Sequence, residues 1–138
     1  MEEKRFHVKR LVASGLRLTK QRLIISKILF DRKTTFHFTI EQLKKNVEKI
    51  GKKKISTATL YNTVNALKIR GYLKAISLKG NKTFFDTNTK HHHHFYDEDM
   101  SQLTDIEDRN ILIGNLPKIP NGKKIKSVEV LVKIVRNN

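Results

Sequence analysis

Four consecutive histidines, His91–His94, are the residues of this chain best suited to chemistry. Histidine-rich tracts commonly bind metal ions, because each neutral imidazole offers one ring nitrogen as a ligand. If the run is extended, successive side chains alternate, so His92 and His94 share one face and His91 and His93 the other. A purification tag and a solvated histidine-rich loop are the alternatives. Tags are normally terminal and longer, whereas this run lies between two patterned stretches, which favours a ligand-binding site.

Positive charge is concentrated in the part of the chain before the histidines. Residues 1–90 contain 22 lysines and arginines against 6 acidic residues, a balance of +16, while residues 91–138 contain 7 of each. A polyanion is the natural partner of such a stretch, because neutralising phosphates releases counterions. A membrane surface would attract the same charge, but no expected helix has the broad aromatic and leucine face of an interfacial anchor. A merely solvated basic surface is the remaining alternative.

Composition excludes several classes of protein. The chain has no cysteine, which excludes disulfides, cysteine zinc sites and thiol catalysis. Its 138 residues are enough to bury a core without a covalent staple. No apolar run approaches the roughly 20 residues that span a bilayer, and residues 1–10 lack an apolar signal core. We therefore expect a cytoplasmic protein with no membrane partner.

Helical periodicity and cap signals predict helices in the basic part. The first covers Phe6–Ala13, and Thr19 caps the second. A capping-box pair, Thr39 and Gln42, opens the third. Its apolar residues recur on one face: Ile40, Leu43, Val47 and Ile50. His37 is expected in the loop that precedes this helix.

The next segment predicts a fourth helix followed by a β-hairpin. Ser56 caps the helix, whose buried residues would be Leu60, Val64 and Leu67. Strands are expected over Leu73–Leu78 and Thr83–Asp86, with a basic turn over residues 79–82. Such an arrangement is a winged helix-turn-helix, in which the last helix enters the major groove and the wing follows the backbone.

The exposed face of that last helix carries side chains suited to reading bases. Ala58, Asn62 and Asn65 lie opposite its apolar face, with Tyr61 at the margin. Asparagine pairs with adenine through two hydrogen bonds. An ordinary solvated helix face is the alternative interpretation of the two asparagines.

The part after the histidines differs in character. An acidic turn at residues 97–99 precedes an expected strand over Leu103–Ile106, and a turn-rich connector covers residues 116–122. Ser127–Arg136 has apolar residues on both faces, which predicts a strand covered from two sides, as at a subunit interface. The expected fold is thus α+β: a winged-helix DNA-binding domain over residues 1–88 and a small α/β dimerisation domain over residues 89–138.

Three motifs, in this order, resemble those of the ferric uptake regulator superfamily. Gly15–Arg22 is similar to its opening signature, Ser56–Thr63 to its recognition helix, and Thr83–Asp86 with the histidines to the end of its wing and its regulatory site. Within the superfamily, residues 80–88, 92–95 and 115–117 look most like the iron response regulator branch. That resemblance implies a homodimeric, haem-responsive repressor or activator of iron genes.

The resemblance also implies site residues. The superfamily motif His-x-His-x-x-Cys-x-x-Cys falls on His92, His94, Asp97 and Met100, so both cysteines are lost and no structural cysteine zinc site is expected. The implied regulatory metal site consists of His37, Asp86, His92, His94 and Asp105. The implied contacts to double-stranded DNA are Arg17, Lys20, Gln21, Ser56, Thr57, Thr59, Tyr61, Asn62, Asn65, Lys79 and Lys82.

More than one ligand fits the histidine run. Imidazoles with carboxylates suit Fe²⁺, Mn²⁺ or Zn²⁺, and without thiolates nothing selects strongly among them. Haem competes, since an iron porphyrin needs only one or two axial imidazoles, which His92, His93 and His94 could supply.

Three functions follow from these ligands. The first is a metal- or haem-responsive transcriptional regulator of iron and haem homeostasis genes, not an enzyme. The second is a peroxide-sensing repressor, as in the peroxide-regulator branch of the superfamily, which works by metal-catalysed oxidation of a ligand histidine. The third is a zinc-dependent nucleic-acid hydrolase.

Overall fold

The computed structural model describes residues 2–51, 54–80 and 82–138, without the side chains of residues 2–7. The chain divides into two compact units, Met1–Thr89 and Lys90–Asn138. Asn81, in the expected basic turn, lies outside the described residues, as do Lys52 and Lys53. In the described part, no helix is long and apolar enough to cross a membrane.

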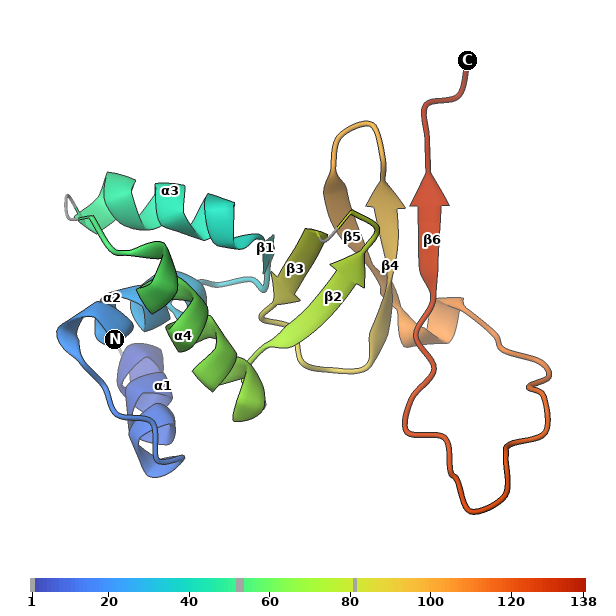
Figure 1. Ribbon diagram of the computed structural model, residues 1–138, viewed down its shortest axis with the longest axis horizontal. Helices are drawn as coiled ribbons and strands as arrows, with labels where there is room; N and C mark the ends of the chain where they lie inside the picture. Colours follow the sequence, from blue (N-terminus) through green and yellow to red (C-terminus); the bar gives the residue numbers. More distant parts are fainter. Residues whose placement is uncertain (1, 52–53, 81) are drawn as a thin grey trace. The chain divides into compact units, whose positions relative to one another are not determined.

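Four helices build most of the first unit (Figure 1): α1 Glu2–Ala13, α2 Lys20–Phe30, α3 Ile40–Gly51 and α4 Thr57–Ile69. The predicted caps are confirmed. Thr19 Oγ1 accepts a hydrogen bond of 3.2 Å from the backbone N–H three residues on. The capping box is reciprocal, since Thr39 N–H donates to Gln42 Oε1 at 3.1 Å and Gln42 N–H donates to Thr39 Oγ1 at 3.2 Å. Ser56 Oγ accepts from the Thr59 N–H at 3.1 Å.

The buried helix faces form one hydrophobic core. The predicted core residues of α4 are all buried, namely Leu60, Val64 and Leu67. On α3 the apolar face buries Ile40, Leu43 and Val47. Ile50 continues this face but is 67% exposed. Its whole turn, residues 48–50, is exposed and lies outside the packed part of the helix.

A three-stranded antiparallel sheet completes the first unit, with β1 His37–Phe38, β2 Lys74–Leu78 and β3 Lys82–Asp86 in the order β1-β3-β2. The β2–β3 hairpin confirms the predicted wing. Strand β1 was not predicted. The expectation that His37 lies in a loop is therefore wrong, and its partner across the ladder is Asp86. Two residues are too few to show a period in the sequence, so only the pairing with β3 reveals this strand.

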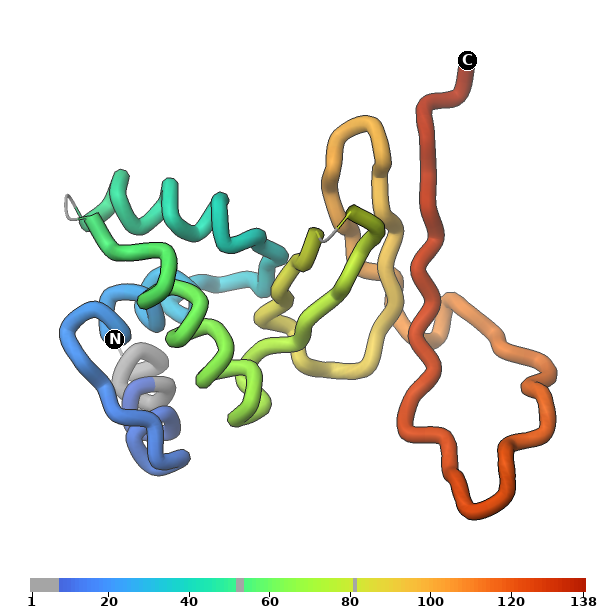
Figure 2. The backbone as a smooth tube through the Cα atoms, viewed as in Figure 1, coloured from blue at the N-terminus to red at the C-terminus, as the bar shows by residue number. Residues whose placement is uncertain are grey.

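The second unit is a small mixed sheet. Strands β4 His92–Asp97, β5 Gln102–Glu107 and β6 Leu131–Ile134 are arranged in the order β5-β4-β6, with β4 antiparallel to β5 and parallel to β6. The 3₁₀ turn η1 Asp108–Asn110 follows β5. Residues 111–130 between η1 and β6 contain no helix or strand and run as a long open excursion (Figure 2).

Strand β6 differs from its prediction. It covers four residues of the ten expected, and it lies at the edge of the sheet with β4 as its neighbour. Leu131 and Val132 are half-buried, while Lys133 and Ile134 are exposed. Coverage from both sides is therefore not supplied by the described part of this chain.

Candidate metal centre and nucleic-acid interface

Unit one places a histidine against a buried carboxylate. The antiparallel register of β1 and β3 puts His37 opposite Asp86, and His37 Nε2 lies 3.2 Å from Asp86 Oδ2. The Asp86 side chain is only 1% exposed, and its Oδ1 accepts a 2.8 Å hydrogen bond from the Asn88 N–H. A buried carboxylate is costly unless a cation or hydrogen-bond donors compensate its charge. Asp86 is thus suited to hold a cation together with His37.

Unit two places two histidines on one carboxylate. On β4, His92 and His94 share a face, as the alternation predicted, and their ring centroids are 4.4 Å apart. Asp105 lies opposite His94 in the β4–β5 ladder. Its Oδ1 is 3.2 Å from His92 Nε2 and 3.3 Å from His94 Nε2. Both histidines are buried and the Asp105 side chain is 34% exposed, so the three donor atoms converge where the buried histidines meet the surface.

These separations suit a shared cation in each unit taken by itself. Two ligand atoms bound about 2.1 Å from one ion at angles near 90–110° lie roughly 3.0–3.4 Å apart. The pair in the first unit and both histidine–carboxylate pairs in the second fall in this range. Nitrogen and oxygen donors without sulfur fit Fe²⁺, Mn²⁺ or Zn²⁺.

A backbone contact sets the tautomer of His92. Its Nδ1 lies 2.6 Å from the carbonyl oxygen of Lys90, and a carbonyl only accepts, so Nδ1 carries the proton. The Nε2 lone pair then faces the acceptor oxygen of Asp105. Two acceptors face each other favourably only with a proton or a cation between them. Such a backbone partner is the usual outer support of a metal-bound histidine.

His93 has the opposite tautomer. The Val130 N–H donates to His93 Nδ1 at 2.9 Å, so Nδ1 is the acceptor and Nε2 carries the hydrogen. That Nε2–H donates to Asp108 Oδ1 at 2.9 Å. His91 reaches the same oxygen at 3.1 Å. The group resembles a metal cluster in composition, but metal at His93 Nε2 would displace a proton that the Val130 contact requires, so His93 serves as a hydrogen-bonded support.

The contact of Asp108 with His91 and His93 was not predicted from the sequence. Alternation alone places His91 and His93 on one face, but Asp108 joins them only through the turn that ends β5. The haem candidates are also divided by this arrangement: His92 and His94 face Asp105, whereas both ring nitrogens of His93 are already hydrogen-bonded. Axial ligation by His93 would break two hydrogen bonds.

The expected DNA-reading face of α4 is exposed to solvent. Tyr61 is 55% exposed, and Asn62 and Asn65 are exposed as well. Two other candidates on this helix are already occupied. Ser56 Oγ and Thr59 Oγ1 lie 2.8 Å apart within the N-cap, so we assign these hydroxyls to the cap.

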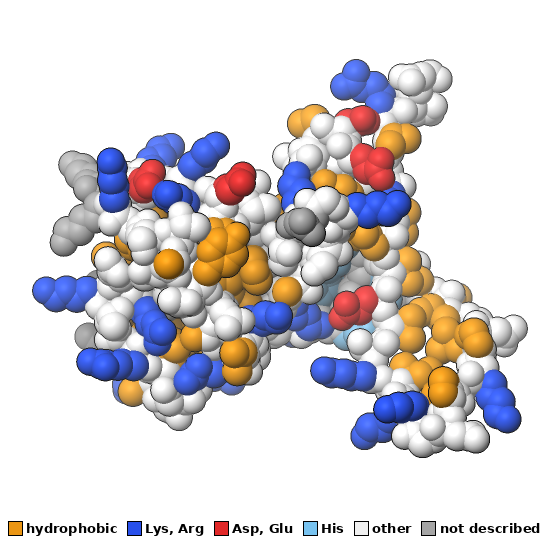
Figure 3. All heavy atoms as spheres, viewed as in Figure 1, with side chains coloured by type: hydrophobic (Ala, Val, Ile, Leu, Met, Phe, Trp, Pro, Cys, Tyr) orange, Lys and Arg blue, Asp and Glu red, His pale blue; other side chains and the backbone are white. Residues whose placement is uncertain are grey.

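The remaining candidates for DNA contact lie around this helix or on the wing. Thr57 accepts a 3.2 Å hydrogen bond from the Lys44 ammonium. Lys79 is exposed beside the hairpin turn, and the Lys82 ammonium lies 5.8 Å from the centroid of the Phe84 ring. Arg17, Lys20 and Gln21 are exposed ahead of and at the start of α2. On the face in Figure 3, lysine and arginine side chains are spread over the helical unit.

The fold belongs to a known class. A solved structure of the ferric uptake regulator from Pseudomonas aeruginosa with manganese matches with a TM-score of 0.69 and 16% identity. The match covers 96% of this chain and 98% of that one. The winged helix-turn-helix followed by a small second unit, an α+β architecture, is therefore the fold of a ferric uptake regulator.

The model of the ferric uptake regulator family matches residues 13–134, and the chain belongs to this family. It is 29% identical over 94 residues to the peroxide-responsive repressor PerR of Staphylococcus aureus, covering 68% of this chain and 62% of that protein. It is also 29% identical over 99 residues to the ferric uptake regulation protein of Vibrio anguillarum, covering 71% of this chain and 65% of that protein. The chain thus spans less than two thirds of these curated relatives.

Proposed function

We propose that this chain is a metal-responsive transcriptional regulator of iron and haem homeostasis genes, acting in the cytoplasm as a homodimer on operator DNA. The observation that carries the proposal is the convergence of His92 Nε2 and His94 Nε2 on one oxygen of Asp105, with the His92 tautomer set by Lys90. We assign one Fe²⁺ or Mn²⁺ ion to the donors of both units, namely His37, Asp86, His92, His94 and Asp105. Zn²⁺ would fit the same donors.

Shared ligation gives the metal a way to control DNA binding. Asp86 is the last residue of β3, which is one of the two strands of the wing. An ion bound by this carboxylate and by the histidines of the second unit restricts the motion of the two units relative to each other. In a dimer, that restriction sets the spacing of the two α4 helices, which must match the half-site spacing of the operator.

The second unit supports self-association. Strand β6 lies at the edge of its sheet, and edge strands commonly pair with another chain unless protected. Large apolar residues in and around the excursion before β6 are exposed, with Leu112 at 94% and Val135, just after the strand, at 65%. A second copy of the chain is the partner we assign to this edge.

Metal is expected to raise operator affinity about ten-fold or more, the usual size of coupling between two sites. AT-rich, roughly palindromic operators are first selected from random DNA in the presence of Mn²⁺, and binding is then followed by fluorescence anisotropy with Mn²⁺ and with chelator. Circular dichroism under the same conditions is the control. Without cysteine ligands, helix content is expected to persist in chelator, and cooperative unfolding would show that metal supplies folding free energy instead.

Peroxide sensing is the second candidate function, because identity to the peroxide-responsive relative equals that to the ferric relative. It predicts that Fe²⁺ followed by peroxide adds one oxygen to His37 or His92 and releases DNA. Peptide mass spectrometry measures the modification, with Mn²⁺-loaded protein as the control. If the peptides stay unmodified and DNA binding persists after peroxide, the protein does not sense peroxide, and iron remains the signal that it senses. A hydrolase is not proposed, because the family is one of regulators.

A further inference from the structure

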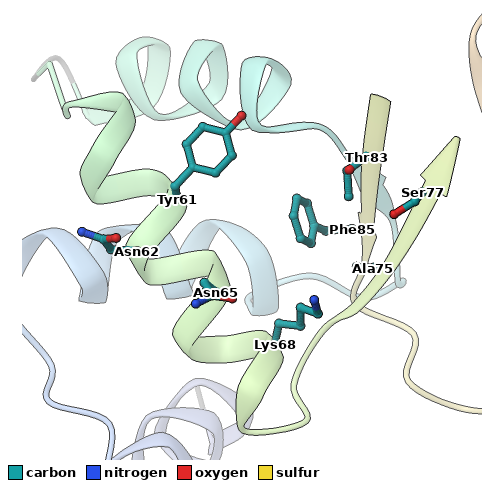
Figure 4. A pocket seen from close by; sticks show the side chains of 8 residues that line it. All are labelled: Tyr61, Asn62, Asn65, Lys68, Ala75, Ser77, Thr83 and Phe85. Atoms are coloured by element: carbon teal, nitrogen blue, oxygen red, sulfur yellow. The ribbon is translucent and has the colours of Figure 1, made fainter. Parts of the chain in front are cut away.

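A groove of about 380 Å³ lies between α4 and the wing (Figure 4). Four residues of α4 and four of the hairpin line it: Tyr61, Asn62, Asn65, Lys68, Ala75, Ser77, Thr83 and Phe85. None of these residues is acidic. The groove is therefore open to an anionic ligand.

The wing contributes an apolar floor and a hydroxyl pair. Ala75 is directly opposite Phe85 in the β2–β3 ladder, and Ser77 is directly opposite Thr83. Residues two apart on a strand share a face, so the four side chains form one continuous patch. The Phe85 ring also stacks on Phe38 with centroids 5.6 Å apart, which fixes the floor to the core.

The helix contributes a cation. In Figure 4 the Lys68 side chain extends from α4 toward the hairpin, whereas Asn62 points away from it. Lys68 is exposed, and within the described part of the chain its ammonium has no carboxylate partner. The groove thus presents the positive charge of Lys68 and the two hydroxyls of the wing above an apolar floor.

We propose that this groove holds one sugar–phosphate unit of the operator backbone in each half-site. The deoxyribose would pack on the Ala75–Phe85 pair, and the phosphate would be bound by Lys68 with the Ser77 and Thr83 hydroxyls. A helix in the major groove with a wing along the backbone leaves one strand passing between them. Phosphate contacts of this kind set register and depth without reading sequence. The inference rests on the proposed function and makes Lys68 a positioning residue.

Lys68→Gln is expected to weaken binding to operator and to random DNA alike, roughly ten-fold, and to reduce the slope of log K against log[salt] by about 0.9 per half-site. The matched control is Lys27→Gln, an exposed lysine in the last turn of α2 that does not line the groove. Ethylation interference supplies the specific readout. In the parent, ethylation of the groove-bound phosphate should be one of several ethylations that block binding, and in Lys68→Gln that effect alone should disappear.

Ala75→Leu tests the floor without changing charge, because the larger side chain fills the groove. It should weaken DNA binding while helix content and the unfolding midpoint stay as in the parent.

An unchanged salt slope and interference pattern in Lys68→Gln would overturn the groove assignment while leaving the proposed function intact. A metal-loaded parent that binds no DNA would overturn both. If inorganic phosphate bound saturably at low millimolar concentration, a free anion and not the DNA backbone would be the occupant of the groove.

Discussion

His92→Leu is expected to reduce Mn²⁺ affinity about 100-fold or more, since loss of even an outer support of a ligand costs 10–100-fold. His93→Leu is expected to leave Mn²⁺ affinity within a few-fold of the parent. It should instead lower the free energy of unfolding by about 1–3 kcal/mol, because the Val130 N–H loses its acceptor and the Asp108 carboxylate loses one donor while it keeps His91. The two neighbours differ because their tautomers differ. Titration of the purified protein with Mn²⁺ and urea denaturation in chelator measure the two effects.

Two further variants sharpen this comparison. His93→Gln retains a hydrogen-bond donor and an acceptor, so it should recover part of the stability lost in His93→Leu. If His93 were a metal ligand, glutamine would not replace it in this way. His37→Ala asks whether the first unit contributes to the same ion. It should cut Mn²⁺ affinity substantially and leave the absorption spectrum of added hemin unchanged, since haem would need only the histidine run. Equal losses of metal affinity in His92→Leu and His93→Leu would refute the tautomer argument.

Local signals predicted much of this fold. The caps at Thr19, Thr39 and Ser56 depend on atoms three residues apart, and the apolar face of α4 depends on helical spacing. The division of the histidine run into two faces follows from the two-residue period of a strand. Each of these features depends on residues that are close together in the sequence.

Contacts between distant segments were not predictable in the same way. Strand β1 exists only through its pairing with β3, about fifty residues on, which also sets the distance from His37 to Asp86. The role of His93 depends on Val130, which is 37 residues away and lies in a segment without helix or strand. The family resemblance supplied the candidates for ligands, and the register of the ladders shows which donors meet within each unit.

Asn62→Ala is expected to remove about 1–3 kcal/mol of discrimination at one base pair per half-site, since a bidentate asparagine–adenine contact is worth this much. In a homodimer the loss occurs twice, about 2–6 kcal/mol in all, so preference for operator over random DNA should fall about 30-fold or more. Tyr61→Ala should act in the same direction, because this exposed ring lies beside Asn62 on α4.

The control for Asn62→Ala is the removal of a lysine charge from the wing. Lys79→Ala and Lys82→Ala should weaken binding to all sequences alike and leave the ratio of operator to random affinity unchanged, because lysines that contact phosphate carry no sequence information. Competition anisotropy with operator and random duplexes at several salt concentrations separates the two behaviours. If Asn62→Ala distinguished operator from random DNA as well as the parent does, α4 would not be the helix that reads bases.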